Sequence, residues 1–488
     1  MRILEIILLI IVTILPFVKR RIAYKIPSNY ILITLGALVS LHLIFEGWRW
    51  QMLPAYILLL LIGWRIIVVD VTHQPKLNFL RVLGFVGIVL LAVVGWALPS
   101  LLPVFTLPAT TGPYKIGSQF IYQETTLEEQ ITEDPSDTRN LMYKVWYPSE
   151  EVVSSLKSEP YLDQAGREGF ATKYGLPANA LNYLDRVETN VYEGLPIAQG
   201  TFPVLIFSHG YGSNAYGYYS LLTELVSHGY IIINMNHTFE SLGSTFPNGD
   251  KKYFDYDFQY RESNNTMHQV EPLIKAFKDG LSYEDRHPIV RESLVNYYRG
   301  PAQGRWADDM IYTMDLLPSW NDSGFLKGKM NLEKLGVFGH SNGGGAAGSV
   351  PIRDGRVKAA ANIDGISWGN RVDTTYHIPF LYISADWPAE HEDINSHVYL
   401  QKSTDYFYET KLMTSGHPNF MDIPFLIPVP ALAGTGSIDP YLGMEITSRL
   451  VTSFFDRHLQ NESGVNIEAL GNQYDLLEMT IHKGDSIK

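Results

Sequence analysis

One serine in this sequence lies in a setting that could make it a nucleophile. The segment Gly339 to Gly343 reads Gly-His-Ser-Asn-Gly and follows the short apolar run Leu335 to Phe338. The spacing Gly-x-Ser-x-Gly is typical of a sharp turn from a strand into a helix, where small residues make room and the serine hydroxyl is exposed. Glycine and alanine continue to Gly348, which favours a helix packed closely against a sheet. We therefore predict that Ser341 is a nucleophile.

A serine hydroxyl becomes reactive only when a base takes its proton, and that base must be oriented by an acceptor. If the chain order is serine, acid, histidine, both partners follow the serine. We expect His417 to be the base, because it lies in a turn-rich segment between the last predicted strand and the last predicted helix. The alternative is that His417 is a solvated loop residue. Other histidines after the serine are less well placed: His377, His391, His397 and His458.

Two aspartates compete for the role of the orienting acid. Asp364 follows the predicted strand Val357 to Ile363, and Asp386 follows the predicted strand Pro379 to Ser384. The end of either strand could bring a carboxylate beside the serine turn. The residues alone leave both aspartates as candidates, and the other one is then expected to stabilise a turn.

Charge that develops on the substrate oxygen needs backbone N–H groups aimed at it. One normally comes from the residue after the nucleophile, here Asn342. The second is expected from the loop after the strand Pro203 to Phe207, and we predict the N–H of Tyr211 because glycines flank it. In the same loop, His209 is expected to be structural rather than a second base.

The elements that must position these residues alternate between strands and helices. This alternation predicts a largely parallel sheet covered by helices on both faces, an α/β fold. Besides the strands named above, we predict strands at Leu141 to Tyr147 and Tyr230 to Met235, and helices at Tyr218 to His228, Arg305 to Leu317 and Leu442 to His458.

The predicted catalytic domain spans residues 118–470, after a linker at 107–117 and before a C-terminal tail at 471–488. An aromatic, polar insertion at about 240–300 contains Asn248-Gly249, a hairpin signal. The insertion is either a surface excursion packed on its own rings or a wall of the substrate cleft.

Residues 1–106 form a different kind of domain. Four apolar stretches predict four membrane helices: Ile3 to Val18, Tyr30 to Phe45, Leu53 to Val69 and Phe79 to Leu102. A cleaved signal peptide is the rival for the first stretch, but its positive charges follow the apolar run. Buried core helices are disfavoured, because the stretches come consecutively with short basic or aromatic connections.

The charges in the connections between these stretches predict how the helices are oriented in the membrane. Basic residues lie between the first and second stretches, from Lys19 to Lys25, and between the third and fourth, at Lys76 and Arg81. The second connection has a single cation, Arg49. Because basic loops stay in the cytoplasm, we expect the chain after the fourth helix to lie outside the cell membrane. The stretches contain few polar residues, so a transporter is disfavoured and a membrane anchor suffices.

Composition excludes several other classes of protein. The 488 residues are 46% hydrophobic, which argues against disorder. The net charge of −13 hides an excess of cations in residues 1–105, so the remainder is strongly acidic and nucleic acid is not an expected partner. There is no cysteine, which excludes disulfides and thiolate sites. The predicted chemistry requires no cofactor and no metal.

Several ordered segments resemble the plasma and type II platelet-activating factor acetylhydrolases, a family of serine lipases. They are GPYKIG, KVWYPS, FPVLIFSHGYGSN, LEKLGVFGHSNGGG, ANIDGISW and GHPNFMD, between about Gly112 and Leu459. The resemblance implies an α/β-hydrolase fold, and its spacing of 23 residues from nucleophile to acid favours Asp364 over Asp386. It also supports His417 as the base. The membrane helices, Asn342 and the insertion are differences from the animal enzymes.

The resemblance implies a calcium-independent hydrolase of short or oxidised acyl esters. We expect a membrane-anchored extracytoplasmic serine esterase whose partner is an ester or lipid substrate. The alternatives are a lipase or cutinase-like polyester hydrolase, since bacterial cutinase-like enzymes share a similar serine turn, and a membrane sensor that keeps the fold without turnover. A sensor has no need of Ser341, Asp364 and His417 together.

Overall fold

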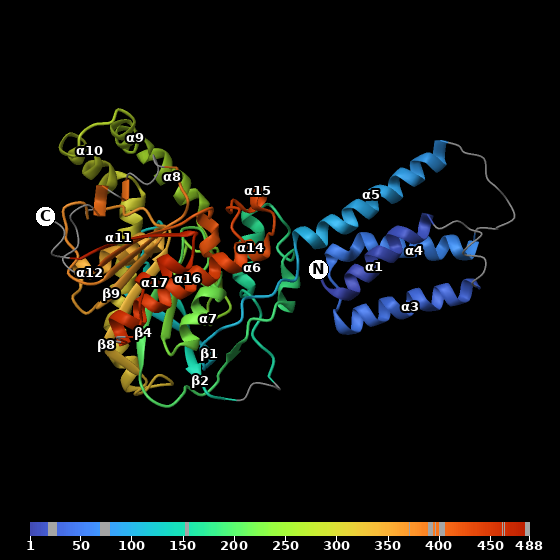
Figure 1. Ribbon diagram of the computed structural model, residues 1–488, viewed down its shortest axis with the longest axis horizontal. Helices are drawn as coiled ribbons and strands as arrows, with labels where there is room; N and C mark the ends of the chain where they lie inside the picture. Colours follow the sequence, from blue (N-terminus) through green and yellow to red (C-terminus); the bar gives the residue numbers. More distant parts are fainter. Residues whose placement is uncertain are drawn as a thin grey trace. The chain divides into compact units, whose positions relative to one another are not determined.

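The structure is a computed structural model that describes residues 1–17, 27–68, 79–151, 156–369, 371–388, 394–395, 397–399, 406–460, 462 and 464–483 (Figure 1). The chain forms two compact units. The first comprises residues 1–106 and 425–429, and the second comprises residues 107–424 and 430–488.

The first unit is built from apolar helices: α1 (Ile3–Ile14), α3 (Ser28–Phe45), α4 (Leu53–Val68) and α5 (Phe79–Leu101), with short 3-10 turns at Leu15–Phe17 and Trp50–Met52. Leu8, Leu9 and Val12 of α1 are fully buried in the core of this unit. Three helices of the described residues have the length and composition to cross a membrane, namely Ser28–Phe45, Trp50–Val68 and Phe79–Leu101.

Four membrane-spanning helices were predicted, and three helices of the described residues have the required length and composition. The described part of α1 has 12 residues, short of the roughly 20 that a bilayer requires. Of the basic residues that predict the orientation, Lys19 to Lys25 and Lys76 lie outside the described residues.

A buried ion pair in the first unit was missed by the sequence analysis. Glu5 of α1 accepts two hydrogen bonds from the guanidinium of Arg49, at 2.7 and 2.8 Å, and neither side chain is exposed. Arg49 also donates to the carbonyl of Leu102 at 2.6 Å. The pair thus links α1 to the connection before α4 and to the residue after α5.

The second unit is organised around a ten-stranded sheet with the order β12-β11-β10-β9-β8-β4-β5-β2-β1-β3. The strands are β1 (Lys115–Glu128), β2 (Thr138–Ser149), β3 (Val191–Glu193), β4 (Phe202–Ser208), β5 (Ile231–Asn236), β8 (Met330–His340), β9 (Ala359–Ile363), β10 (Phe380–Ser384), β11 (Phe407–Leu412) and β12 (Leu477–His482). From β5 to β11 neighbouring strands pair in parallel, whereas β1, β2 and β12 join antiparallel neighbours.

The remaining helices are α6 (Gln164–Lys173), α7 (Tyr219–Ser227), α8 (Tyr256–Thr266), α9 (Glu271–Lys278), α10 (Tyr283–Asn296), α11 (Arg299–Asp322), α12 (Asn342–Arg353), α14 (Ile423–Leu426), α15 (Pro430–Ala433), α16 (Pro440–Phe455) and α17 (Glu468–Gln473). Short 3-10 helices lie at Asn182–Arg186, Met267–Gln269 and His417–Phe420, and a π-helical turn lies at Asp456–Gln460.

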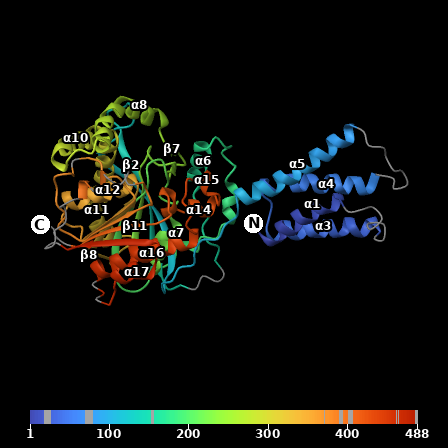
Figure 2. The same ribbon diagram turned by 45° about the horizontal axis from the view of Figure 1, so that its top comes forward.

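Both faces of the sheet are buried, as the continuous apolar strands predict. On one face, Val204 and Ile206 of β4 join a core with residues of α11 and α12. Figures 1 and 2 show these two helices together beside the sheet. On the other face, the ring of Phe207 lies 4.8 Å from that of Phe338, which lies 5.6 Å from Phe455 of α16. The predicted parallel sheet with helices on both faces is confirmed.

Some boundaries differ from the sequence-based expectations. Strand β1 begins at Lys115, inside the expected linker, and α11 begins at Arg299, six residues before its expected start. The strand β11 was not predicted. Residues 471–488 were expected to be a tail, but β12 lies within them and pairs with β11.

The insertion contains the predicted hairpin at Asn248-Gly249: β6 (Gly243–Thr245) pairs with β7 (Lys251–Tyr253). Gly249 has φ = 87°, a conformation that favours glycine. Helices α8, α9 and α10 follow, and near the end of the insertion Tyr297 lines the site described next.

Candidate active site

Ser341 lies at the junction of β8 and α12, where the chain turns sharply from strand to helix. Its φ of 56° and ψ of −123° are unfavourable for a residue with a side chain, and they are held by the packing of the flanking glycines. A Cβ on Gly343 would lie 2.2 Å from the carbonyl oxygen of Ser208, and one on Gly339 would lie 2.4 Å from the carbonyl carbon of Gly343. Close backbone approach therefore requires glycine at both positions.

Asp364 and His417 meet beside this turn. Asp364 follows β9, and its Oδ2 lies 2.6 Å from Nδ1 of His417. Its other oxygen accepts hydrogen bonds from the N–H of Ala385 at 2.8 Å and from Nε1–H of Trp387 at 2.9 Å. Because the carboxylate accepts from Nδ1–H, Nε2 of His417 is left as the basic nitrogen. The imidazole is about one-third exposed, whereas the Asp364 side chain is buried.

Asp386 has a different set of contacts. Its Oδ2 accepts from the N–H of Thr414 at 2.9 Å, and its Oδ1 lies 3.6 Å from Nζ of Lys411. These bonds hold the turn between β11 and the segment that carries His417. The geometry brings Asp364, and not Asp386, into contact with His417.

Ser341, Asp364 and His417 line one cavity of about 410 Å³. Its wall combines aromatic and polar side chains in similar measure; the other lining residues are Tyr211, Tyr297, Arg299, Gln303, Asn342, Ile366, Trp368, Tyr382, Trp387 and Asn395. A concave site in which aromatic side chains surround convergent polar groups can bind a small molecule and fix its orientation.

The two residues whose N–H groups are predicted to bind an oxyanion also line this cavity. Asn342 is the first residue of α12, and N–H groups in the first turn of a helix have no partner within the helix. In the loop after β4, which contains Tyr211, Gly210 N–H donates to the hydroxyl oxygen of Tyr218 and Gly212 N–H donates to the carbonyl of Glu240. Within the described part of the chain, the N–H of Tyr211 between them has no hydrogen bond.

His340, the residue before the serine, connects the two sides of the site. It is buried, and burial holds the pKa of its imidazole well below the usual value, so the ring is neutral. Its Nε2–H donates to the carbonyl of His417 at 3.2 Å, so its Nδ1 accepts from the hydroxyl of Tyr218 at 2.9 Å. The same hydroxyl accepts from Gly210 N–H at 3.0 Å. This chain of bonds ties the loop of Tyr211 to the backbone of His417.

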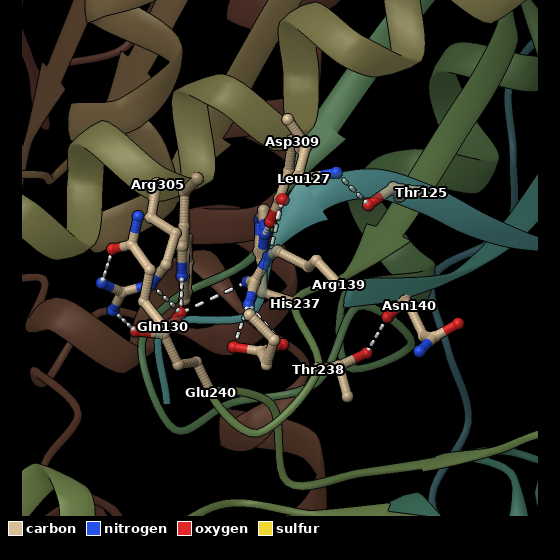
Figure 3. Close-up of polar contacts among 12 residues, drawn as sticks. Thr125, Leu127, Gln130, Arg139, Asn140, His237, Thr238, Glu240, Arg305 and Asp309 are labelled. Atoms are coloured by element: carbon tan, nitrogen blue, oxygen red, sulfur yellow. Dashed lines mark hydrogen bonds and ion pairs between the residues drawn. The ribbon is translucent and has the colours of Figure 1, made fainter. Parts of the chain in front are cut away.

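A second group of Ser, His and Asp side chains lies behind the Tyr211 loop. Ser208 Oγ lies 2.8 Å from Nε2 of His237, and Nδ1 of His237 lies 2.7 Å from Asp309. All three are fully buried, so no substrate reaches them. Asp309 in turn accepts from Arg139 at 2.6 Å. Figure 3 shows the polar contacts of Asp309 with His237 and Arg139.

The same buried network holds Glu240, whose carbonyl accepts from Gly212 N–H. Its carboxylate contacts the guanidinium of Arg305 at 2.5 Å, Nε1–H of Trp306 at 2.7 Å and Arg139 at 3.3 Å (Figure 3). Burial raises the pKa of this carboxyl, but the two arginines outweigh burial and hold it below its usual value. The network therefore holds the loop that contains Tyr211 in place through buried ion pairs.

His209 packs inside this network rather than facing the cavity. It is fully buried, its Nε2 accepts from His237 N–H at 3.3 Å, and its Nδ1 lies 2.6 Å from the carbonyl of Gly210. Burial lowers its pKa well below the usual value. A neutral ring with both nitrogens used fits the structural role predicted for it.

The other histidines have separate contacts. His458 lies 3.0 Å from the hydroxyl of Tyr408, and His397 accepts from Arg286 at 3.1 Å. His391 lies outside the described residues. Sequence reasoning missed Arg299, Tyr297 and His340; the position of His340 beside the serine was the available signal.

The chain is similar to known esterases over most of its length. A model of the family described as platelet-activating factor acetylhydrolase, isoform II, matches residues 102–474. The platelet-activating factor acetylhydrolase of Cavia porcellus is 23% identical over 388 residues, covering 72% of this chain and 78% of the relative. A protein of Arthroderma benhamiae named probable 1-alkyl-2-acetylglycerophosphocholine esterase is 24% identical over 386 residues, covering 73% and 87%.

Among solved structures, a ferulic acid esterase from Streptomyces cinnamoneus has a TM-score of 0.60 and 21% identity, and the match covers 78% of this chain and 100% of that one. The predicted α/β-hydrolase fold is confirmed by this likeness and by the sheet topology.

Proposed function

The chain belongs to the platelet-activating factor acetylhydrolase isoform II family, and on that premise we propose that it is a membrane-anchored serine esterase that cleaves short-acyl lipid esters. The observation that carries the proposal is the 2.6 Å contact between His417 and Asp364 in the same cavity as Ser341. Hydrolase activity agrees with the names of the relatives and of the structural neighbour.

The proposed reaction proceeds through an acyl-enzyme. As Ser341 Oγ attacks the ester carbonyl, its proton passes to Nε2 of His417, and Asp364 stabilises the imidazolium that forms. The N–H groups of Tyr211 and Asn342 donate to the oxyanion. The imidazolium then protonates the leaving alcohol. In the second half of the reaction a water molecule gives a proton to the same imidazole and attacks the acyl carbon, the bond to Ser341 Oγ breaks, Oγ takes the proton back, and the free acid leaves.

Two features support a short acyl group and a lipid substrate. The cavity of about 410 Å³ is at the small end of ligand sites, which suits a short chain. The apolar helices of residues 1–106 would keep the enzyme at a membrane, where lipid esters are available.

The test uses the full chain in detergent with p-nitrophenyl esters of two to twelve carbons. We expect turnover that is highest for the shortest chains and absent in Ser341→Ala. A folded protein that cleaves none of the esters, or Ser341→Ala with wild-type turnover, would overturn the proposal.

The location of the catalytic unit outside the cell is a further part of this proposal, supported by the basic connections at Lys19 to Lys25 and Lys76 to Arg81. Because the chain has no cysteine, single cysteines can report the side of the membrane. A membrane-impermeant maleimide should label Glu133→Cys in intact cells and Lys76→Cys only after lysis. The reverse pattern would show the opposite orientation.

A further inference from the structure

The cavity contains one cation that the proposed mechanism does not use. Arg299 is the first residue of α11, and it lines the cavity together with Ser341 and His417. Its guanidinium lies over the ring of Tyr211, 4.0 Å from the centroid, and 4.7 Å from that of Tyr298. A guanidinium stacked on a ring keeps the N–H groups in its plane free to donate.

No carboxylate of the described residues forms an ion pair with Arg299. The acid that shares the cavity, Asp364, is already bound by His417 and two N–H donors. Glu240, which lies behind the Tyr211 loop, is held by Arg305 and Trp306. The positive charge of Arg299 is therefore not neutralised on its own side of the cavity.

The other polar side chains of the cavity wall differ in whether their polar atoms have hydrogen-bond partners. Gln303 donates to the carbonyl of Ile366, and its oxygen accepts from Trp368 N–H. Asn395 is bonded through both ends of its amide. In contrast, the amide nitrogen and oxygen of Asn342 are buried and have no partner among the described residues.

A cation without a counter-charge in a partly apolar cavity costs free energy unless a ligand meets it. A planar guanidinium with free N–H groups matches the two oxygens of a carboxylate or a phosphate. Arg299 is also fixed against the ring of Tyr211, whose N–H is proposed to bind the oxyanion. An anion on Arg299 would thus lie on the same wall as the reacting carbonyl.

We propose that Arg299 is a specificity-determining residue that selects esters carrying an anionic group, a phosphate or a carboxylate, near the scissile bond. The inference rests on the proposed esterase function and adds the charge of the substrate to it. The anion belongs either to the alcohol side of the ester, as a phosphate, or to the acyl side, as a terminal carboxylate.

The experiment compares matched ester pairs that differ in charge. On the acyl side the pair is mono-p-nitrophenyl glutarate and p-nitrophenyl pentanoate; on the alcohol side it is 1-acetylglycerol 3-phosphate and 1-acetylglycerol. The variants are Arg299→Gln, Arg299→Lys and, as a matched control, Arg261→Gln on the exposed part of α8.

We expect the wild type to prefer the anionic member of at least one pair. Arg299→Gln should lower kcat/KM for that substrate by about 10- to 100-fold, with its neutral partner changed by less than about threefold. Arg299→Lys should recover part of the preference, and Arg261→Gln should retain all of it. The pair that responds identifies the side of the ester that carries the charge.

Three results would overturn the inference. The first is a wild type that cleaves both members of each pair equally well; it leaves the esterase proposal standing. The second is an equal loss for neutral and anionic esters in Arg299→Gln, which would indicate a structural role. The third is a wild type that cleaves no ester, which removes the proposed function as well.

Discussion

Oδ2 of Asp364 lies 2.6 Å from Nδ1 of His417, while Asp386, at the end of the neighbouring strand, contacts Thr414 and Lys411 instead. The two aspartates are equivalent by position in the sequence, since each follows a parallel strand. On the basis of these different partners we propose different roles, an orienting acid for Asp364 and a turn residue for Asp386.

Asp364→Asn is expected to fold and to lose turnover. An amide at this position favours the wrong imidazole tautomer and does not support its positive charge, which lowers kcat about 10⁴-fold in a serine protease. Asp386→Asn should stay within about tenfold of wild type and lose about 1 kcal/mol of stability. Steady-state kinetics and thermal midpoints of both variants show which aspartate orients His417. An inactive but folded Asp386→Asn together with an active Asp364→Asn would show that Asp386 has that role.

Gly343→Ala is expected to prevent formation of the serine turn. The new Cβ would lie 2.2 Å from the carbonyl of Ser208, a backbone atom that cannot move without displacing β4. The matched control is Gly304→Ala within α11, where nothing lies within 4 Å of the new Cβ and alanine should stabilise the helix by roughly 0.5–1 kcal/mol. Yield of folded protein and thermal midpoint report both effects, and a well-folded, active Gly343→Ala would contradict the structure of the turn.

Asp422 predicts a pH dependence of stability. It accepts from Tyr219 N–H at 2.6 Å and from Ser220 N–H and Oγ–H, at the start of α7. Burial raises its pKa from 3.8 to about 6, against the opposing effect of these hydrogen bonds. Because the folded pKa exceeds the unfolded one, the contribution to stability is complete below pH 4 and is lost as the pH rises through 6.

The loss amounts to about 3 kcal/mol at most for a shift of this size. Asp422→Asn does not titrate, so the thermal midpoint of wild type minus that of the variant should fall between pH 4 and pH 7. The subtraction removes the titration of other groups. A difference that grows with pH would mean that the hydrogen bonds outweigh burial.

Glu5→Gln should destabilise the first unit. The substitution leaves the buried guanidinium of Arg49 without its carboxylate, and breaking one side of a buried pair costs about 3–5 kcal/mol. The double variant Glu5→Leu, Arg49→Met should recover much of that loss, because apolar residues of similar size tolerate the same site. Thermal unfolding of the full chain in detergent measures this, and an unchanged midpoint in Glu5→Gln would contradict the burial of the pair.

The parts of the fold that the sequence predicts are those with strong local patterns. Strands β4 and β5 and the part of β8 from Leu335 to Phe338 are largely apolar and buried, and the glycines around Ser341 have a direct steric reason. Strand β11 was missed because Glu409 and Lys411 interrupt its apolar residues, as suits a strand near the edge of a sheet.

The buried charges could not be predicted, because charged residues are almost always exposed unless they are paired. Arg139 pairs with the nearby Glu129 and also with Glu240 and Asp309, which are more than 100 residues away, so that only the fold brings these two to it. The same holds for Arg299, which lies 42 residues before Ser341 in the sequence and faces the same cavity. Spacing can suggest partners within a motif but not across the sheet.

The most direct test of the central claim is the identity of the residue that becomes acylated or phosphonylated. The full chain is treated with a fluorophosphonate, digested, and the modified peptide is sequenced by mass spectrometry, with Ser341→Ala as the control. We expect one modified residue, Ser341, and no labelling in the variant. Labelling at another residue, or labelling that survives in Ser341→Ala, would contradict the assignment of Ser341 as the nucleophile.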